Sequence, residues 1–170
     1  MQSGGRGSTH AGGTTIPNVP SHGLSDAIQD YLKEIYKLAA AGERATTSAI
    51  AGRLGVAAPS ATSMVKKLAA LELVEHAPYR GVELTDAGRQ IAVEVIRHHR
   101  LLEQYLAETL GLPIDAVHAE ADRLEHVLSE ELEARIDKAL GFPTHDPHGD
   151  PIPDAELNWR GESNGEGDDR

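Results

Sequence analysis

Cysteine is absent from this chain of 170 residues, and aromatic side chains make up only 4% of it. Without cysteine there can be no disulfide framework and no thiolate ligand, so any metal site must use oxygen and imidazole donors, which favour harder cations. Long apolar runs are also missing, and the Gly-, Ser- and Thr-rich first twenty residues lack the apolar core of a signal peptide. We therefore expect a globular cytoplasmic protein with no membrane partner.

Positive charge is scarce and unevenly distributed along the chain. The net charge of −11 at first argues against a partner rich in phosphate. However, residues 1–43 carry a net charge of −1, residues 44–100 carry +3 and residues 101–170 carry −13. A basic central block beside an acidic second half is expected if one part contacts DNA and another holds cations.

Helical periodicity dominates the middle of the chain. The spacing predicts helices over about 26–40, 48–54, 59–71, 86–110, 113–128 and 129–141, and two short strands, 73–77 and 82–84, around a turn. This order is typical of a mostly α fold, with a winged helix-turn-helix followed by an all-helical part. Residues 1–24 are expected to form a flexible arm, and residues 154–170 a disordered acidic tail.

The second helix of a helix-turn-helix enters the major groove and presents its first residues to the bases. Small hydroxyl side chains at these positions read bases weakly, and two lysines one turn later suit phosphates. The candidate DNA-binding residues are Arg44, Thr47, Pro59, Ser60, Thr62, Ser63, Lys66, Lys67 and Arg80. A solvated helix face is the plainer interpretation of the lysines alone, but the order of helices and wing favours double-stranded DNA as a partner.

A cluster of carboxylate and imidazole side chains marks the second half. Glu125 and His126 follow Asp122 by three and four positions, which places all three on one side of a helix. His118 stands one turn before Asp122. A further pair, His99 and Glu103, is also one turn apart. Such donors on two helices suggest a divalent-metal site, although ordinary surface pairs remain the alternative.

Three other histidines have plainer interpretations. His98 falls on another face of its helix, so we expect it to be solvated or near a phosphate. His145 and His148 flank Pro147, and we expect them only to brace a loop.

The motifs together resemble the diphtheria-toxin-repressor family of metal-dependent transcriptional repressors. The resemblance covers roughly residues 26–153 and rests on ordered motifs: Tyr31-Leu32 with Ile35-Tyr36, Pro59-Ser60, Leu84-Thr85 with Gly88-Arg89, His99 to Glu103, Glu125-His126, and Pro147 to Pro153. It implies a winged-helix DNA-binding domain, residues 25–93, followed by a helical metal-binding and dimerisation domain, residues 94–153. Many members add an SH3-like third domain, which we expect this chain to lack because it ends soon after Pro153.

The resemblance also implies a ligand assignment. The family's primary metal site falls on Asp30, Asp122, Glu125 and His126, and its ancillary site on His99, Glu103 and His118. Spacing alone would leave Asp30 in solvent, so only the resemblance brings it to the metal. The iron-responsive branch has Met and Cys where this chain has Asp30 and Asp122. The chain is thus similar to the manganese-responsive branch, and carboxylates suit Mn²⁺.

One position departs from that branch. The manganese-responsive members often have a Glu one turn after the first-helix Asp, whereas this chain has Lys33, which cannot ligate while protonated. His118 instead matches the iron branch. The expected cofactor is therefore Mn²⁺, with Fe²⁺ as the alternative.

The function predicted from these observations is metal-dependent repression of metal-uptake genes by a homodimer on a palindromic operator. A winged-helix regulator that senses a small organic ligand is the alternative, because its DNA-binding half would look the same. A metal-dependent enzyme is disfavoured, because the chain has neither an HExxH motif nor paired Glu-x-x-His motifs.

Overall fold

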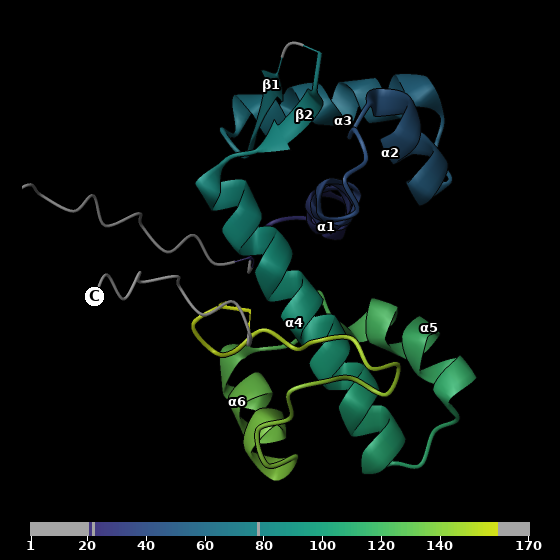
Figure 1. Ribbon diagram of the computed structural model, residues 1–170, viewed down its shortest axis with the longest axis vertical. Coiled ribbons are helices and arrows are strands. Elements are labelled where there is room, and N and C mark those ends of the chain that lie inside the picture. Colours follow the sequence, from purple (N-terminus) through teal and green to yellow (C-terminus); the bar gives the residue numbers. More distant parts are fainter. Residues whose placement is uncertain (1–20, 22, 78, 160–170) are drawn as a thin grey trace, which may run out of the picture.

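The computed structural model describes residues 21, 23–77 and 79–159, which form six helices and a two-stranded sheet (Figure 1). The elements are α1 (Asp26–Ala40), α2 (Thr47–Leu54), α3 (Ala58–Ala70), β1 (Val74–Ala77), β2 (Gly81–Leu84), α4 (Asp86–Glu108), α5 (Ile114–Leu124) and α6 (Glu130–Ala139). The predicted mostly α fold with a winged helix-turn-helix is confirmed. Within the described ranges, no helix is both long and apolar enough to cross a membrane.

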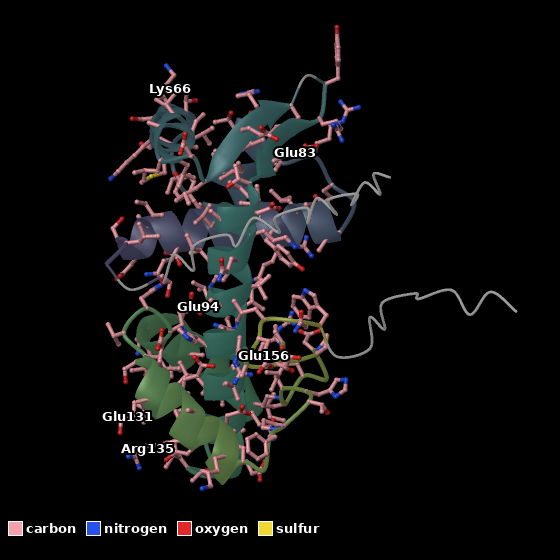
Figure 2. All side chains as sticks on the ribbon, turned by 90° about the vertical axis from the view of Figure 1, so that its left-hand side faces the viewer. Lys66, Glu83, Glu94, Glu131, Arg135 and Glu156 are labelled. Carbon is pink, nitrogen blue, oxygen red and sulfur yellow. The ribbon has the colours of Figure 1, made fainter. Side chains whose placement is uncertain are left out.

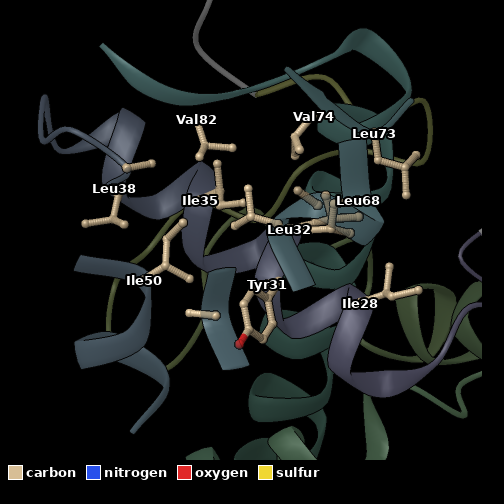
Figure 3. Close-up of a cluster of buried hydrophobic side chains, with 14 of the residues drawn as sticks. Ile28, Tyr31, Leu32, Ile35, Leu38, Ile50, Leu68, Leu73, Val74 and Val82 are labelled. Atoms are coloured by element: carbon tan, nitrogen blue, oxygen red, sulfur yellow. The ribbon is translucent and has the colours of Figure 1, made fainter. Parts of the chain in front are cut away.

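The first half packs around α1, whose apolar stripe is buried under α2, α3 and the hairpin (Figure 3). Leu32 and Ile35 are fully buried, as are Ile50 of α2 and Leu68 of α3. Strands β1 and β2 pair antiparallel, with Val74 opposite Leu84. The hydroxyl of Thr46 accepts a hydrogen bond from the backbone N–H of Ala49 and so caps α2.

A close backbone approach fixes where α4 leaves the wing. A Cβ on Gly88 would lie 2.0 Å from the carbonyl oxygen of Leu73, so no larger residue fits there. The hydroxyl of Thr85 caps α4 by accepting from the N–H of Gly88, and it donates to the carbonyl of Glu72. The start of α4 is thereby anchored to the base of β1.

Helix α4 runs from the winged helix-turn-helix to the second half, where α5 and α6 pack against it (Figure 1). Its first turns contact α1, and its later turns contact α5 and α6. This placement brings residues of α1 close to residues of α5. The chain after α6 then returns along α4, and Arg97 donates to the carbonyl of Pro153.

Two differences from the predicted elements bear on the site. Helix α5 ends at Leu124, not near residue 128, because the N–H of Val127 bonds to the carbonyl of Leu124 in a tight turn. Glu125 and His126 therefore lie in the turn after the helix. Helix α4 ends at Glu108, two residues earlier than expected. Residues 1–20 of the expected arm and 160–170 of the expected tail lie outside the described residues.

Candidate metal centre and nucleic-acid interface

Asp30 of α1 lies against His126 in the turn after α5. Its Oδ1 is 3.0 Å from His126 Nε2, and the Asp30 side chain is 39% exposed. The other ring nitrogen of His126, Nδ1, donates to Gln29 Oε1 at 2.8 Å, which fixes the orientation of the imidazole. Asp30 thus contacts the second half of the molecule, although its spacing along α1 alone predicts that it faces solvent.

Glu125 is buried at the centre of the cluster, with 1% of its surface exposed. Its Oε1 accepts from Lys33 Nζ at 2.5 Å, and its Oε2 lies 2.6 Å from His99 Nδ1. The ammonium of Lys33 also lies 3.4 Å from Asp122 Oδ1. One buried carboxylate therefore connects α1, α4 and the end of α5.

The predicted ancillary residues also meet one another. His99 Nε2 lies 3.1 Å from Glu103 Oε1 and 3.0 Å from His118 Nδ1. His118 Nε2 lies 3.5 Å from Asp122 Oδ2, and His99 Nδ1 lies 3.3 Å from Asp122 Oδ1. Asp122 consequently stands between the two predicted sites.

A third set of donors was missed by the sequence reasoning. His148 Nδ1 lies 3.5 Å from Glu103 Oε2, and Asp146 is buried beside them. The Asp146 side chain accepts hydrogen bonds from the backbone N–H groups of His148 and Asp150, a turn in which Gly149 has φ 90°. His148 does brace this loop, as expected, but it also faces Glu103. The sequence feature that could have indicated this third set is Asp146-Pro147-His148, in which two possible ligands stand two positions apart.

The donors fit a divalent cation in three groups, in each of which the ligand atoms lie within 4.8 Å of one another. The groups are Asp30 with Glu125 and His126, Asp122 with His99 and His118, and Glu103 with Asp146 and His148. All seven predicted metal ligands are thus brought together, although Asp122 and Glu103 are grouped differently from the assignment that the resemblance implies. Oxygen and nitrogen donors alone match a hard or borderline divalent ion.

Two histidines of the cluster carry shifted pKa values. Burial alone would lower the pKa of His99, but hydrogen bonds with Glu103 and Glu125 raise it to about 9. For Glu103, burial alone would raise the pKa, but the hydrogen bond and charge of His99 lower it to about 2. The hydrogen bond with Asp30 raises the pKa of His126. The neighbouring carboxylates therefore favour the protonated forms of His99 and His126, and a metal ion that binds these imidazoles displaces their protons.

The expectation that His98 is solvated was wrong. It is 1% exposed, with Nδ1 3.1 Å from the carbonyl oxygen of Glu125 and Nε2 3.0 Å from Glu133 Oε2. The face of α4 that carries His98 is covered by α6, which the sequence pattern of α4 alone does not show. His98 therefore supports the backbone of Glu125 and lies away from the DNA-binding half.

The candidate DNA-binding residues lie at the end of the molecule opposite α6. The side chains at the start of α3 and its two lysines, Pro59, Ser60, Thr62, Ser63, Lys66 and Lys67, are all exposed. Figure 2 shows Lys66 at this end, with Glu131 and Arg135 of α6 at the other. Arg44 and Arg80 are also exposed and Thr47 is half-buried; Arg80 pairs with Glu83 at 3.2 Å. Thr62 donates to the carbonyl of Ala58, so its hydroxyl is partly occupied.

Comparison with known proteins agrees with this division of the chain. Residues 23–82 match the sequence model of the iron dependent repressor N-terminal DNA binding domain, and residues 85–154 match that of the iron dependent repressor metal binding and dimerisation domain. The iron-dependent repressor IdeR of Mycobacterium tuberculosis is 42% identical over 130 residues, which are 76% of this chain and 56% of that protein.

Two further proteins are similar. The diphtheria toxin repressor of Corynebacterium diphtheriae is 39% identical over 76% of this chain and 58% of its own length. A solved structure of a manganese-dependent transcriptional repressor in complex with manganese has a TM-score of 0.70 and 47% identity, over 78% of this chain and 61% of that one. The chain therefore spans somewhat more than half the length of the curated relatives it matches. On this evidence it belongs to the iron-dependent repressor family, which includes the diphtheria toxin repressor.

Proposed function

We propose that the protein is a metal-dependent transcriptional repressor, which binds an operator as a homodimer when Mn²⁺ is bound and so controls metal-uptake genes. Fe²⁺ is the alternative cofactor. The observation that carries the proposal is the contact of Asp30, on the helix at the centre of the winged-helix half, with His126 of the other half. Ligands shared between two halves of a molecule make their relative position depend on the metal. Such a repressor acts in the cytoplasm, where it meets DNA.

The residues of the cluster perform the coupling. Asp30, Asp122 and Glu125 carry negative charges that repel one another when brought together. Lys33 offsets part of this repulsion between Asp122 and Glu125, and a bound divalent cation would supply the further positive charge that holds Asp30 to Glu125. Asp30 then holds α1 against the end of α5, and α1 supports the packing of α2 and α3. This fixes the orientation of α3 and raises operator affinity, a coupling typically of about 1–3 kcal/mol.

Mn²⁺ is preferred over Fe²⁺ in this proposal because of the chemistry of the donors. All are carboxylate oxygens or imidazole nitrogens, and cysteine is absent from the chain. Hard, oxygen-rich sites suit Mn²⁺, whereas thiolate and thioether ligands select softer metals. The same donors bind Zn²⁺ tightly, so the metal that activates must be found from DNA binding and not from affinity.

Dimerisation is proposed to use apolar side chains that the second half leaves exposed. Ile114, Leu124 and Val127 are 53%, 39% and 71% exposed, in contrast to Val117 and Ala121, which the fold buries. An exposed apolar surface on this helical half suits an interface between two copies. Sedimentation of a Val127→Asp variant tests this: loss of the dimer supports the interface, and an unchanged dimer contradicts it.

The metal proposal is tested by operator binding measured by fluorescence anisotropy during an anaerobic Mn²⁺ titration. Asp122→Ala and His126→Ala should abolish metal-stimulated binding and leave a folded dimer. Glu120→Ala is the matched control, since Glu120 lies on the same helix and, among the described residues, forms its ion pair with Arg123 at the surface. Wild-type activation of either ligand variant would refute the site.

The DNA surface is tested separately. Lys66→Ala should weaken binding to all sequences similarly and reduce the slope of log affinity against log salt by about 1. Lys138→Ala on α6 is the control, because Lys138 is also exposed but lies in the other half. An unchanged slope for Lys66→Ala would remove Lys66 from the interface.

A further inference from the structure

Lys33 is a buried cation in the middle of the metal-ligand cluster. Only 6% of its surface is exposed, although lysine is rarely buried to this degree without partners. Its ammonium contacts two candidate ligands, Glu125 Oε1 at 2.5 Å and Asp122 Oδ1 at 3.4 Å. These two carboxylates belong to different donor groups, so Lys33 stands where the groups meet.

Two hollows flank this lysine, and Lys33 lines both. One, of about 350 Å³, is lined also by Asp30, Asp122 and His126. The other, of about 290 Å³, is lined also by Glu103 and His148 among other donors. Lys33 therefore forms part of the wall of each hollow.

Each carboxylate oxygen of Glu125 already has one partner. Lys33 Nζ holds one carboxylate oxygen and His99 holds the other. A divalent ion bridging Asp122 and Glu125 would need to lie about 2 Å from an oxygen of each, as oxygen ligands do in compact divalent sites. The ammonium occupies that position and repels a second cation.

We propose that Lys33 is a built-in cation that blocks a bridging metal position between Asp122 and Glu125 and so sets the number of ions that each subunit binds. The inference rests on the proposed metal-sensing function and adds the residue that fixes its stoichiometry. The wild-type chain binds ions only on either side of the ammonium. Removal of the positive charge, with the carboxylates left in place, opens one further position.

The test counts bound ions by native mass spectrometry and by calorimetric titration with Mn²⁺. Lys33→Met removes the charge and keeps a side chain of similar length, so it should bind one more Mn²⁺ per subunit than the wild type. Lys33→Arg keeps the charge and should retain the wild-type number. Lys37→Met is the matched control: Lys37 lies one turn later, lines both hollows and, within the part of the chain that the structure describes, pairs with Glu34 at 3.4 Å and not with a predicted metal ligand.

Lys33→Met removes the ammonium that donates to Glu125, so this variant could misfold. A second variant keeps the proposal testable in that case. Lys33→Gln retains an N–H donor for Glu125 and should also gain one ion. Tighter binding without an added ion, or numbers equal to those of Lys37→Met, would overturn the proposal. If the wild type bound no Mn²⁺ while both neutral variants did, the role of Lys33 would stand and the proposed function would fail. If none of the proteins bound Mn²⁺, both would fail.

Discussion

The two halves of the molecule are built on different kinds of interior. In the winged-helix half, one cluster of buried apolar side chains extends over α1, α2, α3 and the hairpin and reaches the first turns of α4 (Figure 3). Among the described residues, the members of this cluster are all hydrophobic, so none of them forms an ion pair. Its stability comes from apolar surface removed from water and from close packing.

The second half has a small apolar cluster and many buried charges. Among the described residues, the buried members of its cluster are Leu102, Ala121, Leu128 and Ile136. Around it lie buried Arg97, Glu103 and Glu125 with their partners. Arg97 alone donates to Glu133 at 2.5 Å, to Asp137 at 2.8 Å and to the carbonyl of Pro153 at 2.6 Å.

This contrast assigns different sensitivities to the two halves. Apolar packing responds little to salt, protons or cations, so the DNA-binding half is a stable body that can be moved as a unit. Buried charges are costly to desolvate and depend on their partners, so we expect the second half to respond to pH and, in the proposed function, to metal. A sensor requires this division between a responsive part and a rigid output part.

The largest effect is expected from Arg97→Met. The substitution removes the guanidinium from buried Asp137 and from Glu133, which keeps its contact with His98, and it should lower the free energy of unfolding by about 3–5 kcal/mol. Chemical denaturation measures the loss, and hydrogen exchange should locate it in α4 and α6. Arg135→Met, which breaks only an exposed pair with Glu131, should cost less than about 0.5 kcal/mol. Equal losses would show that the buried pair is not what holds this half.

Next in size is Leu68→Ala in the first half. Leu68 is fully buried, so its truncation leaves a cavity and should cost about 3 kcal/mol. The comparison of the halves predicts that this loss is the same at low and high salt and with or without Mn²⁺. Leu71→Ala is the control because Leu71 is 45% exposed. A salt-dependent loss for Leu68→Ala would break the contrast between the two interiors.

The sequence predicted the first half well because its elements follow local rules. The stripe of α1, the cap before α2 and Pro59 at the start of α3 each specify structure within a few residues. The seven side chains predicted as metal ligands lie close together in the structure, and most of them stand at helical spacing in the sequence. Asp30 needed the family resemblance, because only the docking of α1 against α5 brings it to His126.

The rest depended on long-range packing that periodicity does not encode. In α4, Val95, Ile96, Arg97, His98 and His99 are consecutive and all buried, because neighbours cover the helix on every side. Polar residues in this stretch are buried together with apolar ones, so the helical pattern of α4 does not show which of its polar residues face solvent, and the prediction for His98 failed. Asp146 and His148 were not assigned to the site because their loop reaches Glu103 only after the chain has folded back along α4.

A smaller effect is expected from pH, and only in the second half. His99, with its pKa raised to about 9, contributes stability fully below pH 6.5 and loses it as pH rises to about 9. Glu103, with its pKa lowered to about 2, contributes above pH 4.5 and loses stability as pH falls to about 2. In chelator, hydrogen-exchange protection of α5 should therefore be greatest between pH 4.5 and 6.5, once exchange rates are corrected for pH. Protection of α3 should stay level; a parallel decline in α3 would contradict the comparison.

The smallest effect concerns the contact that joins the two halves from the C-terminal segment. Trp159 stacks on Tyr36 of α1 with ring centroids 6.0 Å apart, and the guanidinium of Arg100 lies 5.4 Å from the Trp159 ring. Such aromatic and cation–π contacts contribute about 0.5–1.5 kcal/mol each at partly exposed sites. Trp159→Ala should therefore lower the free energy of unfolding by about 1 kcal/mol, measured by denaturation followed by circular dichroism, whereas Trp159→Phe should retain most of this stability.

Hydrogen exchange tests whether the Trp159 contact couples the two halves. Because Trp159 contacts Tyr36 of the winged-helix half and Arg100 of the later part of α4, its loss should increase hydrogen exchange in α1 near Tyr36 without affecting α6. If exchange in α1 were unchanged, the Trp159 contact would not couple the two halves.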